Sequence, residues 1–105
     1  MGYRVEVAES FAQDYDAVLD YLANKLGSPQ AASKLASSIA DAAELLGDMP
    51  EIHAVSHRRN LRERGVRMHL VGSYVILYLI NGSVIQFLRL FHRSQCFEDD
   101  RYWLD

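Results

Sequence analysis

The feature that most constrains this fold is a pair of strand-like segments separated by the dipeptide Asn81-Gly82. Residues 66–80 and 83–93 are dominated by Val, Ile, Leu, Phe and Tyr, most of which favour β-strands. Asn and Gly both tolerate the positive φ angles that a two-residue hairpin turn requires. The C-terminal half of the chain is therefore predicted to form antiparallel strands, with Asn81 and Gly82 as a turn.

The N-terminal residues predict a strand and then a helix. Residues 3–7 alternate apolar and polar side chains, which is typical of a short strand. Ser10 and Gln13 have the spacing of a capping box, which predicts a helix start. Apolar residues follow at three- and four-residue spacing as far as Leu26, and Gly27 can adopt the left-handed conformation that ends a helix.

A second helix is predicted directly after the first. Ser28 can cap its N-terminus and Pro29 suits the first helical position, while Gly47 and Pro50 mark its end. The link between the two helices is so short that they are predicted to run antiparallel. Residues 51–64 have no clean period and are predicted to form a surface loop.

A chain of 105 residues has room for one domain, and residues 1–105 are predicted to form one. Cys96 is the only cysteine, so no intrachain disulfide is possible and a reducing compartment fits best. The first residues lack the pattern of a signal peptide, and no apolar run approaches the roughly 20 residues that cross a bilayer. These features predict a cytoplasmic protein that does not enter a membrane.

The net charge of −3 hides a strong asymmetry along the sequence. Residues 1–57 hold three basic and nine acidic residues, whereas residues 58–97 hold seven arginines and one acid. Arginine suits phosphate because its planar fork offers two parallel donors to one anion. The basic segment therefore predicts contact with nucleic acid or with an acidic protein, although the protein's own acidic half could also neutralise it. The seven are Arg58, Arg59, Arg62, Arg64, Arg67, Arg89 and Arg93.

The predicted hairpin brings two histidines together. With a turn at residues 81–82, His69 and His92 become diagonal neighbours on one face of adjacent strands, about 7 Å apart. Arg67 lies two residues further along the same face. Arg93 points to the other face unless a bulge near the end of the strand turns it back.

Two imidazoles and a guanidinium at the open end of a sheet can cleave RNA through its own 2′-hydroxyl. Histidine suits both proton transfers because its pKa lies near neutral pH, and arginine stabilises the charge on the phosphate. The simpler interpretation is that His69 and His92 are polar because the strands emerge into water there. His53 and His57 have no carboxylate or cysteine nearby to complete a metal site, so no metal or other cofactor is predicted.

The strand sequences also carry a family pattern. It comprises the end of the second helix at Asp48-Met49-Pro50 and the strands GVRMHLVGSYVILYLI and VIQFLRLFHR. The most specific part matches a glycine, an apolar residue and an arginine, followed by V-G-x-Y and an aliphatic run that ends in tyrosine. The matching positions are Gly65, Val66, Arg67, Val71, Gly72, Tyr74 and Tyr78. In these features, and over nearly its whole length, the chain resembles the RelE/ParE superfamily of bacterial toxins.

Together with the element order, the resemblance predicts an α+β fold: an antiparallel sheet of about four strands with an N-terminal α-hairpin packed on one face. It also implies a toxin that a cognate antitoxin holds inactive. Members of the superfamily either cut messenger RNA on the ribosome or poison DNA gyrase.

By position, His69 and His92 resemble the histidine pair of the ribonuclease branch, and Arg67 and Arg93 are expected to hold the phosphate. Tyr102 resembles a C-terminal aromatic residue that some members use. The arginines expected to contact the RNA backbone are Arg58, Arg59, Arg62 and Arg64.

Different residues favour different branches. Val75 occupies a position where some messenger-cleaving members carry a catalytic arginine, and the ungapped V-G-x-Y and the terminal His-Arg are closer to the gyrase-directed branch. His69, in an otherwise apolar strand, favours the ribonuclease. We therefore interpret the chain as a ribosome-dependent, metal-independent mRNA endoribonuclease. The alternatives are a non-catalytic inhibitor of gyrase and a toxin that has lost its activity and binds only its antitoxin.

Overall fold

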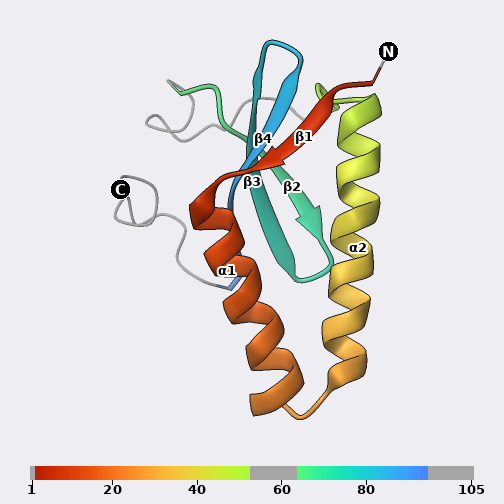
Figure 1. The fold of residues 1–105 in the computed structure, drawn as a ribbon, viewed down its shortest axis with the longest axis vertical. Helices are drawn as coiled ribbons and strands as arrows, with labels where there is room; N and C mark the ends of the chain where they lie inside the picture. The colour runs from red at the N-terminus through yellow and green to blue at the C-terminus, as the bar shows by residue number, and fades with distance from the viewer. Residues whose placement is uncertain (1, 53–63, 95–105) are drawn as a thin grey trace.

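The computed structural model of the protein describes residues 2–52 and 64–94, with two helices on one face of a four-stranded sheet (Figure 1). This arrangement confirms the predicted α+β class and the α-hairpin. In chain order the elements are β1 (Arg4–Val7), α1 (Glu9–Asp20), the π-helical turn η1 (Tyr21–Lys25), α2 (Pro29–Asp48), β2 (Arg67–Val71), β3 (Tyr74–Asn81) and β4 (Val84–His92). Neither helix is long and apolar enough to cross a membrane, as far as the described residues go.

The sheet is mixed rather than purely antiparallel, which corrects the prediction. Its strand order is β1-β4-β3-β2, and β1 runs parallel to β4 while the other neighbours are antiparallel. Backbone hydrogen bonds from Arg4 N to Ser83 O and from Ala8 N to Phe87 O mark the two ends of the parallel ladder. The prediction failed here because the α-hairpin returns the chain so that β1 lies beside the last strand.

The segment 66–80, predicted as one strand, contains a second hairpin turn. Gly72 adopts a φ of +60°, and Val71 pairs directly with Tyr74 across the turn of Gly72 and Ser73. A left-handed φ is readily adopted only by glycine, so Gly72 allows the tight turn that separates β2 from β3. The C-terminal half of the sheet is therefore a three-stranded meander.

The hairpin at Asn81-Gly82 is confirmed, but its predicted register is wrong. Asn81 pairs with Val84 as the last residues of the ladder, so the turn consists of Gly82 and Ser83. Within the described part of the chain only glycines have positive φ, and Gly82 has a φ of +62° while Asn81 does not. Ile80 therefore pairs with Ile85.

The first helix begins differently from the prediction and ends as predicted. Its N-cap is Ala8, which makes no side-chain cap, so the capping box is wrong. The hydroxyl of Ser10 instead donates to the carbonyl oxygen of Leu88 on β4, at 2.7 Å. Gly27, with a φ of +65°, closes the helix after η1, and Ser28 N donates to Leu22 O across it. This bond spans six residues, one more than in a Schellman motif, because the last turn of the helix is π-helical.

Ser28 also caps α2, as predicted. Its side-chain oxygen accepts from Ala31 N at 3.2 Å, and Pro29 occupies the first turn. We expect Ser28→Ala to lower the free energy of unfolding by about 0.5–1 kcal/mol, because the N–H of Ala31 loses its side-chain acceptor and keeps the 3.1 Å bond to the carbonyl oxygen of Ser28. Urea denaturation measures the difference. Ser37→Ala, at an exposed position in the middle of α2, is the control and should be neutral; equal losses in both variants would contradict the capping role.

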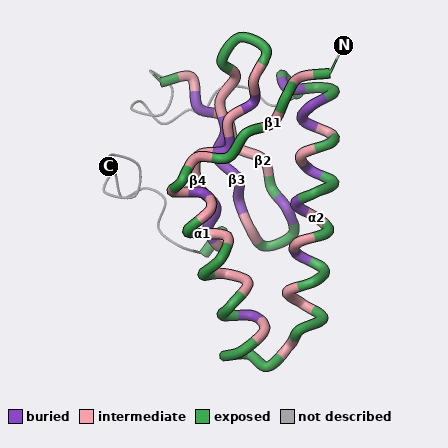
Figure 2. The backbone as a smooth tube through the Cα atoms, in the orientation of Figure 1, coloured by how far each residue is buried: buried purple, intermediate pink, exposed green. Residues whose placement is uncertain are grey.

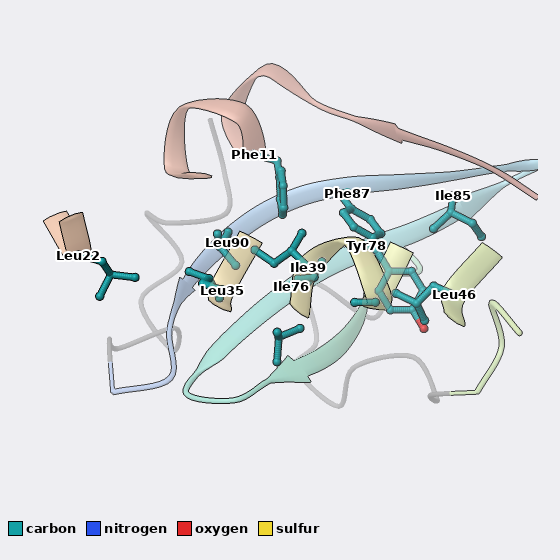
Figure 3. Packing of buried hydrophobic residues seen from close by; sticks show 12 residues of the cluster. Phe11, Leu22, Leu35, Ile39, Leu46, Ile76, Tyr78, Ile85, Phe87 and Leu90 are labelled. Atoms are coloured by element: carbon teal, nitrogen blue, oxygen red, sulfur yellow. The ribbon is translucent and has the colours of Figure 1, made fainter. Parts of the chain in front are cut away.

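The core lies between the two helices and the sheet (Figures 2 and 3). In Figure 3, Phe11 of α1 points toward Phe87 of β4, and residues of α2 lie beside Ile76 and Tyr78 of β3. A second, smaller cluster, on the face away from the helices, contains Val66, Val75, Leu77 and Phe91. The larger cluster consists of Phe11, Leu22, Leu35, Ile39, Ala42, Leu46, Val71, Ile76, Tyr78, Ile85, Phe87 and Leu90.

Candidate functional site

A β-bulge in β4 decides which face carries His92. Tyr78 pairs with Phe87 and Leu77 pairs with Arg89, so Leu88 has no partner on β3. The extra residue reverses the alternation of the strand beyond it. His92 consequently pairs with Tyr74 and lies on the same side of the sheet as the helices.

His69 and His92 share this face, but they are not neighbours. His69 pairs with Ile76 on β3, and Ile76 pairs in turn with Leu90 on β4, so a whole strand lies between the two histidines. Two strand spacings and two residues along the strand correspond to about 12 Å between their Cα atoms. The predicted diagonal contact is therefore wrong, because the turn at Gly72 inserts β3 between them.

Each histidine lines a hollow of its own. His69, half-buried on β2, lines a shallow hollow of about 220 Å³ against α2, with Ser38, Asp41, Ala42, Leu45, Leu70 and Val71. His92 lines a larger cavity of about 720 Å³, which we call the strand-end cavity. Its walls are Ala17, Val18, Tyr21, Leu22 and Leu26 on the helical side and Ser73, Tyr74, His92 and Ser94 on the sheet side.

Hydrogen bonds with Ser94 fix the tautomer of His92. Its Nδ1 lies 3.0 Å from the backbone N of Ser94 and 2.7 Å from Ser94 Oγ. A backbone N–H can only donate, so Nδ1 is the acceptor and the neutral ring carries its proton on Nε2. The ring also meets the ring of Tyr74 edge-on, with centroids 5.2 Å apart and an interplanar angle of 84°.

Tyr74 and Tyr21 add phenol groups to the strand-end cavity. Burial raises the pKa of Tyr74 above its usual value of 10.0, and the nearby Tyr21 raises it further. Tyr74 is therefore a neutral hydroxyl at physiological pH. Tyr21 and Leu26 lie at the two ends of the π-helical segment, where Leu26 N donates to Tyr21 O, and both remain about half exposed at the cavity.

The predicted basic residues fall in different places. Arg67 is half-buried on β2, where it pairs with Tyr78, and Arg93 is exposed after β4, with its backbone N–H donating to Ser73 O. Arg64 is exposed before β2. Arg58, Arg59, Arg62 and Tyr102 lie outside the described residues, as do His53, His57 and Cys96. No group of His, Cys, Asp and Glu that could hold a metal occurs in residues 2–52 and 64–94.

One arginine of the basic half is neutralised within the protein. Arg89 Nε lies 2.7 Å from Asp14 Oδ2, and Nη2 lies 3.2 Å from Oδ1. Asp14 Oδ2 also accepts from the backbone N of Leu90 at 3.0 Å. Asp14 is not among the predicted site residues, although an acid on the apolar face of a helix, three residues after Phe11 and four before Val18, is a signal for a buried partner.

The sequence and the fold both have known counterparts. Residues 5–97 match the family model described as the ParE toxin of the type II toxin–antitoxin system parDE. No curated protein sequence matches the chain.

Several solved structures share the fold at low sequence identity, including the following three. One from the chromosomal ParDE toxin–antitoxin system of P. aeruginosa has a TM-score of 0.68 at 21% identity, covering 86% of this chain and 95% of that one. One from the RelBE2 toxin–antitoxin complex of Mycobacterium tuberculosis has a TM-score of 0.64 at 21% identity, covering 89% and 100%. YafQ of E. coli strain BL21(DE3) has a TM-score of 0.55 at 17% identity, covering 90% and 98%.

Proposed function

The chain belongs to the ParE toxin family of type II toxin–antitoxin systems, and we propose that it is a toxin that acts by binding DNA gyrase rather than by cutting RNA. Membership of this family implies a cognate antitoxin as its partner. The family model, the ungapped V-G-S-Y of residues 71–74 and the His92-Arg93 pair that ends β4 all support the gyrase-directed branch.

The observation that carries a binding function is the position of β3 between His69 and His92. The two imidazoles line separate hollows, whereas acid–base cleavage of RNA requires both at one phosphate. His92 also uses Nδ1 to accept from Ser94 N, so its neutral ring offers Nε2–H as a donor rather than a second nitrogen as a base. Donors suit contact with a carbonyl or carboxylate of a protein target.

We propose that the contact surface is the end of β4, with His92 and the exposed Arg93 as its polar residues. Arg93 directly follows β4, and its backbone N donates to Ser73 O at 2.8 Å. This bond fixes the position of the backbone from which the side chain extends. An exposed arginine at such a place can steer and hold an acidic partner surface.

Ribonuclease activity is the second candidate. The observation that favours it is that His69, His92 and Arg67 all lie on the helix side of the sheet. In this alternative the histidines share the acid and base roles, Arg67 and Arg93 hold the phosphate, and the target is ribosome-bound message.

Induced expression in a bacterial host separates the two candidates. Gyrase binding should give DNA breaks and an SOS response with intact message, together with inhibition of supercoiling by purified gyrase. New message ends in ribosome-associated RNA, mapped by primer extension, with intact DNA would contradict the gyrase proposal and support the ribonuclease. Growth that is unaffected by the wild-type chain would contradict both and favour a toxin that only binds its antitoxin.

Variants of the strand end test the contact surface. We expect Arg93→Ala and His92→Ala each to weaken the inhibition of gyrase by about tenfold or more, because a polar contact at the target is lost. Arg4→Ala is a matched control, because Arg4 is exposed on β1, its Nη2 lies 2.9 Å from Glu6 Oε2, and its replacement removes the same charge. Inhibition by Arg93→Ala and His92→Ala at the level of Arg4→Ala would contradict this surface. His69→Ala should leave gyrase inhibition unchanged, whereas ribonuclease activity would require His69.

A further inference from the structure

The face on which His92 lies depends on a single unpaired residue. In a regular strand, side chains alternate, so residues 89 and 91 would share the helix side with Phe87 and His92 would lie on the far side. The bulge at Leu88 places Leu90 and His92 on the helix side instead. Without it, His92 would not line the strand-end cavity.

The burial of apolar side chains favours neither register strongly, because residues 87–91 have the nearly symmetric sequence FLRLF. Either register places Phe87 and one further apolar residue, Leu90 or Phe91, under the helices. The registers differ chiefly in the position of Arg89, which would lie among the core side chains if the strand were regular. The choice between them therefore falls to polar contacts.

Those contacts come from α1. Ser10 Oγ donates to the carbonyl of Leu88, the bulged residue itself, at 2.7 Å. Asp14 Oδ2 accepts from the backbone N of Leu90 at 3.0 Å and from Arg89 Nε at 2.7 Å. Three consecutive residues of β4 are thus bound by two residues one turn apart on a single helix.

The position of this contact in the sheet explains why α1 makes it. The last pair of β1 and β4 is Val7 with Phe87, so β1 ends immediately before the bulge. Beyond that pair, this side of β4 has no strand partner among the described elements, and unpaired backbone groups there need other acceptors and donors. The side chains of Ser10 and Asp14 supply them, because α1 begins directly after β1 (Figure 1).

We infer that Asp14, assisted by Ser10, is a positioning residue that holds β4 in the bulged register and so turns His92 toward the strand-end cavity. This inference deepens the proposed function and rests on it only for the use of His92 at the target. Asp14, in the middle of α1, would thus control the orientation of His92, which lies 78 residues later in the chain.

NMR of the isotopically labelled full chain, made by cell-free synthesis, tests the inference. The wild type should show an NOE between the Tyr74 and His92 rings and the ¹⁵N shifts of a neutral imidazole protonated at Nε2. In Asp14→Ala we expect this NOE to disappear and the Leu90 amide to exchange about tenfold faster, because its acceptor is gone. Asp14→Asn keeps an acceptor oxygen and should retain the NOE, which separates the acceptor role from the charge. A folded Asp14→Ala with an unchanged NOE and tautomer would overturn the inference.

A milder variant covers the case in which Asp14→Ala does not fold. Ser10→Ala removes only the bond to Leu88 O, and it should speed exchange at Leu90 and give a second set of His92 signals. A Ser10→Ala spectrum that matches the wild type in the His92 signals and in Leu90 exchange would overturn the inference.

Growth inhibition, measured in parallel, distinguishes this inference from the proposed function. If Asp14→Ala moves His92 and growth is still inhibited, the positioning role stands and the proposed use of His92 at the target fails. If growth inhibition is lost while the Tyr74–His92 NOE is intact, the positioning role is contradicted.

Discussion

Replacing Phe87 with alanine should lower the free energy of unfolding by about 3–5 kcal/mol, the largest loss that we expect from a single truncation in this sheet. Phe87 is 1% exposed, and its ring lies 5.3 Å from that of Phe11 at an angle of 56°. It is also flanked by Val7 on β1 and Tyr78 on β3, so it joins α1 to both neighbouring strands (Figure 3). The cavity left by alanine opens at the centre of the larger core cluster.

Urea denaturation of Phe87→Ala beside the wild type measures this loss. Small domains are stable by only about 5–15 kcal/mol, so the variant should unfold at a much lower urea concentration. Phe87→Leu refills most of the volume and should cost less than about half as much. Leu70→Ala, at a position that is 59% exposed, is the control for a sheet truncation outside the core. A loss for Phe87→Ala no larger than that for Leu70→Ala would contradict the packing described.

Local signals in the sequence predicted local structure well. Gly27 and Ser28-Pro29 each act within one turn of a helix, and the structure uses them as predicted. Asn81-Gly82 predicted a hairpin for the same reason, and the turn moved by one residue because only Gly82 has a positive φ. The resemblance to a toxin superfamily supplied the arrangement of helices on the sheet, which no local signal contains.

The errors concern contacts between distant residues. No nearby residue indicates that β1 pairs with β4 in parallel, because the partner of Arg4 is Val84. Gly72 lies in the middle of a strand-like segment, so residues 66–80 were predicted as one strand and the turn was missed. The bulge at Leu88 depends on Ser10 and Asp14, and nothing in FLRLF itself specifies it. The prediction therefore placed His69 and His92 on one face correctly, but not at the right distance from each other.

Removing the hydroxyl of Tyr78 should have the second-largest effect, about 2 kcal/mol at neutral pH. Tyr78 is fully buried on β3, and its hydroxyl donates to the carbonyl oxygen of Pro50 at 3.0 Å. Pro50 is also buried, so Tyr78→Phe leaves an acceptor without its partner in the interior. This bond joins the segment after α2 to the sheet. Tyr74→Phe, at the half-buried tyrosine of the strand-end cavity, is the matched control and should cost less.

The same tyrosine should make the fold sensitive to alkali. Burial raises the pKa of Tyr78 above its usual value of 10.0, and the positive charge of Arg67 opposes part of that rise. Above about pH 10 the unfolded chain loses the phenol proton while the folded chain keeps it. The contribution of Tyr78 to the free energy of unfolding is therefore fully present below that pH and is lost as the pH rises through the raised pKa. Urea unfolding at about pH 8 and about pH 11 should show that the free energy of unfolding declines less in Tyr78→Phe than in the wild type. Tyr74 contributes to the decline that remains, because burial raises its pKa too. An identical decline in both proteins would contradict the raised pKa of Tyr78 in the folded state.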